Sequence, residues 1–214
     1  MLSRVAIAAL TACAANAPQP VSAPCQGPAE VRSTAGAEAL GACDLLPALA
    51  VSGGSRIDLE SLETLGVVSG DLVVGPSSQL SSLGGLRGLK TVTGDVVIES
   101  NFQLSGVFLS TLDSIGGDLT IRSNASIGSV SLPSLRAIAG SLEITENGSL
   151  EAVIAPALRD VGGNLEITAP RVSILELQAE IVVRGTTHID VANQPIPVTE
   201  TTADPHSPTR SLPE

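Results

Sequence analysis

A five-residue motif recurs along the chain at almost constant spacing. Its first residue is glycine, its second is Asp, Ser or Asn, and its third and fifth are aliphatic. The motif begins at Gly70, Gly94, Gly117, Gly140 and Gly163, so successive glycines are 24, 23, 23 and 23 residues apart. A fixed period of this length, with a short β-prone stretch in every copy, is typical of a solenoid whose coils stack on their neighbours.

Aliphatic residues at fixed distances from each glycine predict the buried core. Positions two and four after the glycine are aliphatic in all five copies, which places them on the inner face of a strand and the intervening residues on its outer face. Further aliphatic columns follow at positions ten, thirteen, eighteen and twenty-one. The same phase extends back to Pro47, with Leu49 and Val51 at positions two and four.

These columns predict an all-β fold, a right-handed parallel β solenoid of about six coils of 23 residues. The aliphatic residues between Val172 and Val183 are expected to finish the stack as irregular strands that cover its open end. The six coils are expected to begin near Pro47, Gly70, Gly94, Gly117, Gly140 and Gly163.

An asparagine stands seven residues after the glycine in three consecutive coils, as Asn101, Asn124 and Asn147. A buried asparagine at a corner of the solenoid can bond to backbone groups that water does not reach, in its own coil and in the adjacent one. We therefore expect a structural ladder. N-glycosylation is the alternative, because Asn124 and Asn147 are each followed two positions later by serine.

A second polar column directly follows the glycines. Asp71, Asp95 and Asp118 occupy it in consecutive coils, and Ser141 and Asn164 occupy it in the next two. Stacked carboxylates could hold Ca²⁺, which takes oxygen ligands. However, Asp, Ser and Asn all accept hydrogen bonds from nearby backbone N–H groups in turns. The neutral residues later in the column favour turn capping over a metal site, and no cofactor is expected.

The first residues have the pattern of an export signal. A basic start and a short apolar run occupy residues 1–12, and this run is too short to span a bilayer. Residues 10–13 (LTAC) resemble the lipobox of bacterial lipoproteins, which implies cleavage before Cys13 and lipidation of that cysteine. An ordinary leader that contains a cysteine is the alternative.

The lipobox resemblance also implies a location. Residues 13–24 are rich in alanine and proline and predict a flexible tether between the lipid and the domain. Ala14 is not the aspartate that retains enterobacterial lipoproteins at the inner membrane. The resemblance therefore implies an exported protein, lipid-anchored in a bacterial cell envelope, at the outer membrane.

Once Cys13 is assigned to the lipid, Cys25 and Cys43 remain as a disulfide pair just before the first coil. Closing this loop should stabilise the fold by about 3 kcal/mol in the chain-entropy model. A metal site is disfavoured because no histidine lies near them. A reactive pair would normally stand closer, as in C-x-x-C.

The cysteines and the repeats form a specific pattern, which consists of Cys25, Gly27, 31–34 (VRST), Leu40 and Cys43, followed by G-[DS]-L-x-I-x-x-N-x-x-L repeats. This pattern resembles the receptor L-domain family. Its best-known members are the ligand-binding domains of the insulin and EGF receptors, and similar repeats occur in fungal cell-wall proteins and bacterial lipoproteins. The resemblance covers residues 25–191 and implies a non-catalytic binding scaffold. Leucine-rich repeats are the alternative, but they place the next apolar residue two rather than three positions after the asparagine.

Charge and composition narrow the possible partners. The net charge of -11 argues against nucleic acid and against direct contact with anionic membranes, because phosphate binding needs clustered Lys and Arg. Attachment to a membrane is expected through the N-terminal lipid. Residues 192–214 contain five prolines without apolar periodicity and are expected to be a disordered tail.

The chain contains few of the histidine, lysine and tyrosine side chains that often act as acids or bases in catalysis. It has two histidines, His188 and His206, one lysine, Lys90, and neither Tyr nor Trp. No nucleophile elbow, histidine pair or phosphate loop is present. We expect a protein that is not an enzyme. A carbohydrate-acting β-helix enzyme is the less favoured alternative.

The outer strand positions of the central coils form the candidate binding face. Glu99 and Arg122 are expected to pair between adjacent coils. Aromatic platforms for glycans are scarce, so the expected partner is another macromolecule, a protein. A structural spacer of the envelope without a discrete ligand is the alternative. The candidate face consists of Val97, Glu99, Thr120, Arg122 and Glu143.

Overall fold

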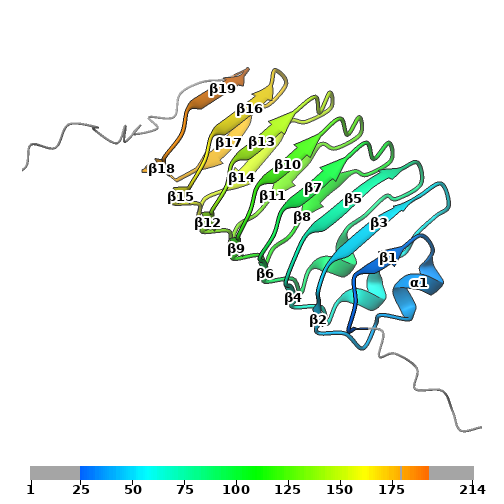
Figure 1. Cartoon of the computed structure of the whole chain (residues 1–214). Coiled ribbons are helices and arrows are strands. Elements are labelled where there is room, and N and C mark those ends of the chain that lie inside the picture. Colours follow the sequence, from blue (N-terminus) through cyan, green and yellow to red (C-terminus); the bar gives the residue numbers. More distant parts are fainter. Residues whose placement is uncertain (1–24, 179, 193–214) are drawn as a thin grey trace, which may run out of the picture.

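Each copy of the glycine motif leads into a short strand that pairs in parallel with the corresponding strands of the neighbouring copies (Figure 1). The computed structural model describes residues 25–178 and 180–192. The predicted leader, Cys13, the tether up to residue 24 and the tail from residue 193 lie outside the described residues. The described part is a parallel β solenoid, which confirms the predicted fold class.

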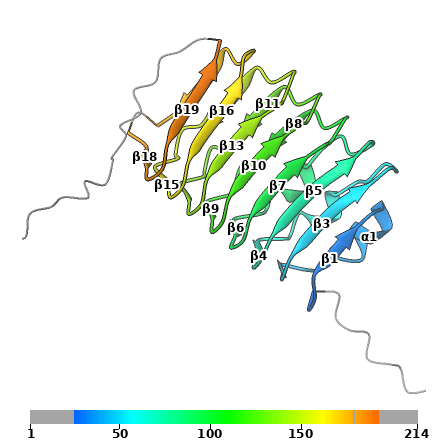
Figure 2. The same ribbon diagram turned by 45° about the horizontal axis from the view of Figure 1, so that its top comes forward.

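Three parallel sheets form the sides of the solenoid (Figures 1 and 2). Sheet A has eight strands, which are β1 (Ala29–Val31), β3 (Leu49–Gly53), β5 (Leu72–Ser77), β7 (Val96–Glu99), β10 (Leu119–Arg122), β13 (Leu142–Thr145), β16 (Leu165–Ala169) and β19 (Thr187–Val191). Sheet B has seven strands, which are β2 (Leu45–Leu46), β4 (Val67–Val68), β6 (Thr91–Val92), β9 (Ser114–Ile115), β12 (Ala137–Ile138), β15 (Asp160–Val161) and β18 (Val182–Val183). Sheet C has four strands, which are β8 (Gly106–Phe108), β11 (Ser129–Ser131), β14 (Ala152–Ala155) and β17 (Ile174–Leu177).

Short helices replace the third side of the solenoid in its first coils. They are α1 (Thr34–Glu38), η1 (Glu60–Leu62) and η2 (Gly84–Leu86), and each contacts the next. Ser33 caps the N-terminus of α1, where its Oγ accepts from Gly36 N at 3.2 Å. The residue before the N-cap leucine of η1 and of η2 accepts from the first N–H of that helix, as Asp58 Oδ1 does from Glu60 N at 2.9 Å and Ser82 Oγ from Gly84 N at 3.0 Å. None is long and apolar enough to cross a membrane, and this holds for every helix in the described part of the chain.

The predicted aliphatic columns form one continuous core. Leu119 and Ile121 of β10 lie beside Val96 and Ile98 of β7. All positions predicted to point inward, from Leu49 to Val161, are buried. The apolar part of the interior is built from aliphatic side chains and one disulfide, because the two aromatic residues of the chain lie outside it. Four polar residues are buried beside it, which are Ser77, Asn101, Asn124 and Asn147.

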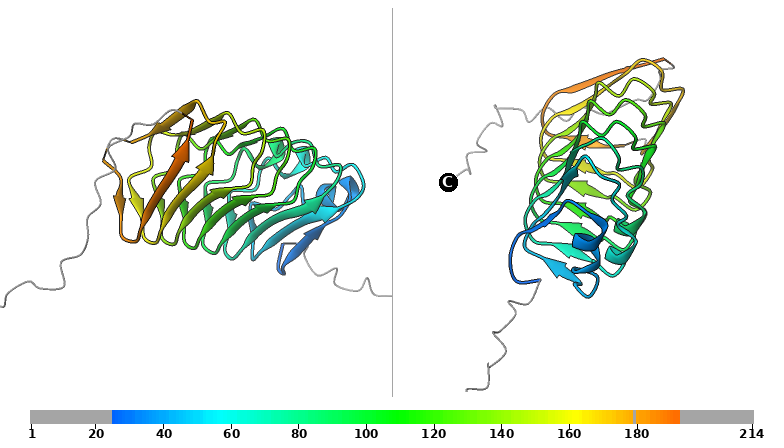
Figure 3. Two further views of the ribbon diagram at one scale, coloured as in Figure 1. Left: turned by 90° about the horizontal axis from the view of Figure 1, so that it is seen from above. Right: turned by 90° about the vertical axis from the view of Figure 1, so that its right-hand side faces the viewer.

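The stack is longer than six coils at both ends. β1 pairs with β3 in front of the coil that begins near Pro47. At the other end, β17, β18 and β19 continue all three sheets in register, with Leu165 opposite Thr187 and Ala169 opposite Val191 (Figure 3). The expectation of irregular covering strands was therefore wrong. The periodicity is hidden there because Thr187 stands where earlier coils have an aliphatic residue.

A disulfide closes the N-terminal end of the stack. Cys25 and Cys43 are bonded, with their Cα atoms 5.5 Å apart. The bond ties the segment before β1 to the segment after α1, and Cys43 is buried in the first layer of the core. This confirms the predicted pairing.

Candidate functional site

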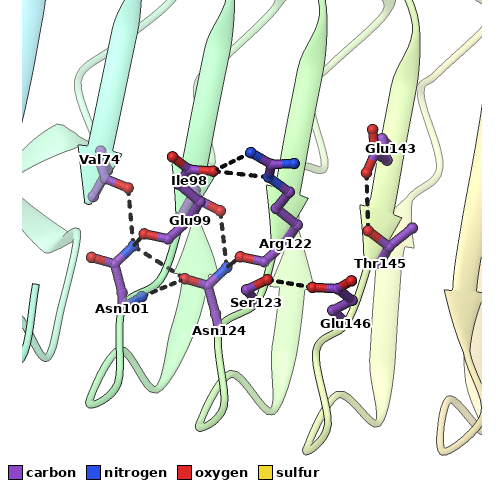
Figure 4. A network of polar contacts seen from close by, with 10 residues as sticks. All are labelled: Val74, Ile98, Glu99, Asn101, Arg122, Ser123, Asn124, Glu143, Thr145 and Glu146. Carbon is purple, nitrogen blue, oxygen red and sulfur yellow. Dashed lines mark hydrogen bonds and ion pairs between the residues drawn. The ribbon is translucent and has the colours of Figure 1, made fainter. Parts of the chain in front are cut away.

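The three corner asparagines form a buried ladder between coils, and Figure 4 shows its rungs at Asn101 and Asn124. The Nδ2 group of Asn124 donates to Ile98 O and Arg122 O, both at 2.9 Å, so it bonds to the preceding coil and to its own. Its Oδ1 accepts from the backbone N–H of Asn101 at 3.0 Å. Asn147 Oδ1 accepts from the backbone N–H of Asn124 at 3.1 Å in the same way. We name Asn101, Asn124 and Asn147 the Asn ladder.

The ladder leaves no room for a glycan. Asn124 is 0% exposed and Asn147 is 4% exposed. The Nδ2 group of each residue donates hydrogen bonds to two backbone carbonyls. An oligosaccharyl group on Nδ2 would have to replace these bonds inside the core. The structural ladder is confirmed as the role of these two residues.

The backbone turns sharply just before each rung of the ladder. Ser100, Ser123 and Glu146 adopt positive φ angles of 55°, 54° and 56°, although none is glycine. The left-handed conformation costs about 1–2 kcal/mol for a residue with a side chain. The hydrogen bonds of the adjacent asparagine hold the chain in this turn.

The Asn ladder ends at β5. Ser77 takes the position that asparagine has in the next coil, and its Oγ donates to Gly53 O at 2.9 Å. Its backbone N–H donates to Ser100 O, so it does not reach the side chain of Asn101. Asn101 Oδ1 is consequently one of the few buried polar side-chain atoms without a hydrogen-bond partner in the described residues.

The polar column after the glycines forms a second ladder on the surface. Asp71 Oδ1 accepts from Asp95 N at 2.9 Å, and Asp95 Oδ1 accepts from Asp118 N at 2.8 Å. The same bond continues through Asp118, Ser141 and Asn164, each of which accepts from the backbone N–H one coil further on. We name these five residues, Asp71, Asp95, Asp118, Ser141 and Asn164, the turn ladder. Turn capping is confirmed, and it acts across coils.

The turn ladder explains the glycine of the repeat. A Cβ at Gly117 would lie less than 3.0 Å from Asp95 Oδ1, and a Cβ at Gly140 would lie as close to Asp118 Oδ1. The carboxylate of one coil thus occupies the space that a side chain in the next coil would need. Glycine and the polar residue form one unit that spans two coils, a coupling that sequence reasoning missed.

The acidic column does not assemble a metal site. Each carboxylate of Asp71, Asp95 and Asp118 is directed at a backbone N–H of the following coil. Within residues 25–178 and 180–192, no group of three or more His, Cys, Asp or Glu side chains is placed to hold a metal ion.

The candidate face lies on the outer side of sheet A (Figure 4). Thr120 lies between Val97 and Glu143 in the register of the sheet. Arg122 Nε donates to Glu99 Oε2 at 2.8 Å, which confirms the predicted ion pair. The hydrogen bond and the charge of Glu99 raise the pKa of Arg122, which stays a permanent cation. Glu143 accepts from Thr145 Oγ1 at 3.0 Å in its own strand.

The other residues considered for catalysis are scattered. His188 is exposed on β19, opposite Glu166 of β16. Lys90 is exposed before β6 on another side of the solenoid, and His206 lies outside the described residues. These residues do not come together in a constellation. The hollows on the described surface are shallow, and one of about 350 Å³ lies beside Phe102 at the Asn corner.

No protein-family model, curated protein or solved structure matches this chain.

Proposed function

We propose that this protein is a non-catalytic, lipid-anchored scaffold of the cell envelope that binds another protein through the outer surface of its coils. The observation that supports it most is the outer surface of sheet A, whose strands pair in continuous register from β5 to β19. Eight strands present their outer residues at a spacing of about 4.8 Å, on a frame bonded by two side-chain ladders. Such a surface binds by preorganised contacts and does not have to be ordered when the partner arrives.

The envelope location rests on two independent features. The segment before Cys13 has the pattern of an export signal with a lipobox. The disulfide between Cys25 and Cys43 fits an oxidising compartment outside the cytosol. The resemblance to receptor L domains supports binding as the role of the solenoid.

The central part of sheet A is the first surface to test. Arg122 and Glu143 lie on adjacent strands, with the side chain of Arg122 about half exposed. We expect chemical cross-linking of the lipidated protein in its native membrane to give a discrete product with one partner. Changing Arg122 and Glu143 together to alanine should reduce this product without a change in the unfolding midpoint, because exposed residues usually shift stability by less than about 0.5 kcal/mol.

The lipid anchor is tested separately. Cys13→Ser should release the protein from the membrane fraction into the soluble fraction, and the intact mass of the wild type should show an acylated Cys13. A Cys13 found unmodified or bonded to another cysteine would contradict the anchor. A native membrane that yields no cross-linked partner would favour the spacer role. Turnover of a defined polysaccharide by the purified protein would contradict the non-catalytic role.

A further inference from the structure

The only two aromatic residues of this chain, Phe102 and Phe108, both lie in the solvent. Phe102 is 62% exposed and Phe108 is 53% exposed. Both belong to the same coil, between β7 and β9. Large rings ordinarily contribute to the core, and here the core is built without them. The two rings therefore need an explanation other than folding.

Each ring has a defined local setting. The ring of Phe108 lies over Gly106, where a Cβ would come within 3.0 Å of the ring atoms. In the register of sheet C, Ser131 is the neighbour of Phe108 in the next coil. Phe102 forms one wall of the hollow of about 350 Å³ at the corner, together with Pro76 and Ser78 of the preceding coil. Small neighbours leave both rings accessible.

The stretch of chain that carries the rings, and its counterparts in the next two coils, contain few charged residues, and Glu146 and Arg171 border them at the corner. We name residues 102–110, 125–133 and 148–156 the neutral face, which runs from the Asn corner across sheet C in three successive coils. These 27 residues include one charged residue, Glu151, in a chain in which 15% of the residues are charged. The outer residues of sheet C beside the rings are Gly, Ser, Ala and Ile, as in Ser129, Ala152 and Ile154.

We infer that the neutral face is a docking site for a short, uncharged segment of a partner protein that carries aliphatic side chains. One such side chain would occupy the hollow that borders the neutral face at Phe102, and another would pack on the ring of Phe108. The rest of this hollow is lined by residues of the two preceding coils, which are Gly53, Gly54, Pro76, Ser77 and Ser78. Aromatic residues, phenylalanine among them, are enriched at the cores of protein interfaces relative to the rest of the surface. This inference rests on the proposed function and adds a second contact with the partner, on sheet C, to the one proposed for sheet A.

The size of the neutral face favours a segment over a second copy of the chain. Nine residues along each coil and three coils across give about 430 Å² at strand spacing. A stable dimer needs about 800 Å² from each partner. Two copies, each with a net charge of -11, would also repel one another.

A lipid surface fits the neutral face poorly. Proteins that dip aromatic rings into a bilayer usually surround them with Lys and Arg, which attract anionic headgroups. The 27 residues of the neutral face contain neither Lys nor Arg.

The inference is tested with a random peptide library selected against the full-length mature protein. The selected consensus should be uncharged and contain aliphatic residues. Phe102→Ala and Phe108→Ala should each weaken binding of the consensus peptide about 10-fold or more, the usual effect of truncating an anchor. Leu45→Ala is the matched control, because Leu45 is 43% exposed on sheet B and should leave binding unchanged.

A second variant keeps both rings. Ser131→Glu places a charge between Phe108 and Ile154 on the outer side of sheet C, and it should weaken binding as strongly as loss of a ring. Its unfolding midpoint, compared with that of the wild type, shows whether the fold is intact.

Several results would overturn the inference. They are the selection of no peptide, a charged consensus, binding insensitive to the phenylalanines, ring-dependent binding to vesicles of phosphatidylcholine and phosphatidylglycerol, or a ring-dependent dimer in sedimentation. Cross-linking in native membranes separates this inference from the proposed function. If a partner is recovered in equal amounts from the wild type and from both phenylalanine variants, this inference is overturned and the proposed function stands. Failure to find any such partner would contradict both.

Discussion

Replacing Asn124 by alanine should be among the most damaging single changes of a polar residue in this protein. The side chain bonds to Ile98 O, Arg122 O and the backbone N–H of Asn101, besides its contacts with the neighbouring asparagine side chains. Asn124→Ala would leave these three backbone groups without this partner at a position that is 0% exposed. Leaving a buried group without a partner costs about 1–3 kcal/mol. Arg122 O keeps the backbone N–H of Ser100 as a donor at 3.3 Å, so not all three groups are left without a partner. We therefore expect a loss of about 1–3 kcal/mol in the free energy of unfolding, mainly from the N–H of Asn101.

The matched control is Asn101→Ala at the end of the same ladder. Asn101 Nδ2 donates hydrogen bonds to Val74 O and Glu99 O, each at 3.0 Å. Asn101 Oδ1, in contrast, accepts no hydrogen bond within the described residues. Asn101→Ala removes an oxygen that is already without a partner, so it should lower the free energy of unfolding by less than Asn124→Ala does. The difference should be about 1 kcal/mol or more, the cost of one further buried group left without a partner.

Urea denaturation followed by far-UV circular dichroism measures both values, since the chain has no Trp or Tyr for fluorescence. The midpoints should fall in the order wild type, Asn101→Ala, Asn124→Ala. Equal midpoints for the two variants, or a larger loss for Asn101→Ala, would refute the reasoning that orphaned backbone groups set the cost.

Three further changes test other parts of the frame. Gly117→Ala should lower the free energy of unfolding by about 1–3 kcal/mol, because the added methyl collides with Asp95. In the same urea titration, Gly148→Ala should lower it by under about 1 kcal/mol, since a Cβ there meets nothing within 4 Å, and equal losses would rule out the steric coupling. Ile121→Asp should abolish the cooperative transition, because a carboxylate would be buried in a core position that is 0% exposed, and a folded spectrum would contradict the assigned core. Cys43→Ser should lower the free energy of unfolding by about 3 kcal/mol, and reduction of the disulfide in the wild type should reproduce this loss. An unchanged urea midpoint would show that the disulfide does not stabilise the fold.

The periodic part of the fold could be read from the sequence because its cause is periodic. Aliphatic residues such as Leu119 and Ile121 recur at the same phase in every central coil, and burial follows from that phase. Asn124 was recognisable as a structural residue because it repeats. The last turn was missed because Thr187 breaks the aliphatic column, although Gly185 still follows Gly163 by 22 residues.

Other features could not be predicted because they depend on contacts between coils. The bond from Asp95 to the backbone of Asp118, and the lack of space at Gly117, require knowledge of which atoms face each other across the stack. The constant pairing of glycine with Asp, Ser or Asn was the available signal. The exposure of Phe102 and Phe108 was equally hidden, since aromatic residues are ordinarily assigned to a core.

The turn ladder has a consequence for the length of the molecule. Every coil from Gly94 to Gly163 presents a side-chain oxygen acceptor at the same position, which is Asp, Ser or Asn, and each has glycine at the position that this acceptor contacts, so any one of these coils can follow any other. Removing residues 117–139 would bring Asp95 against Gly140 and Ser141, which would replace Gly117 and Asp118 in equivalent positions. The protein would become shorter by one strand spacing, about 4.8 Å, with both ladders unbroken. The distance between its two ends can therefore change in steps of one coil, by duplication or loss of 23 residues, without the invention of a new contact.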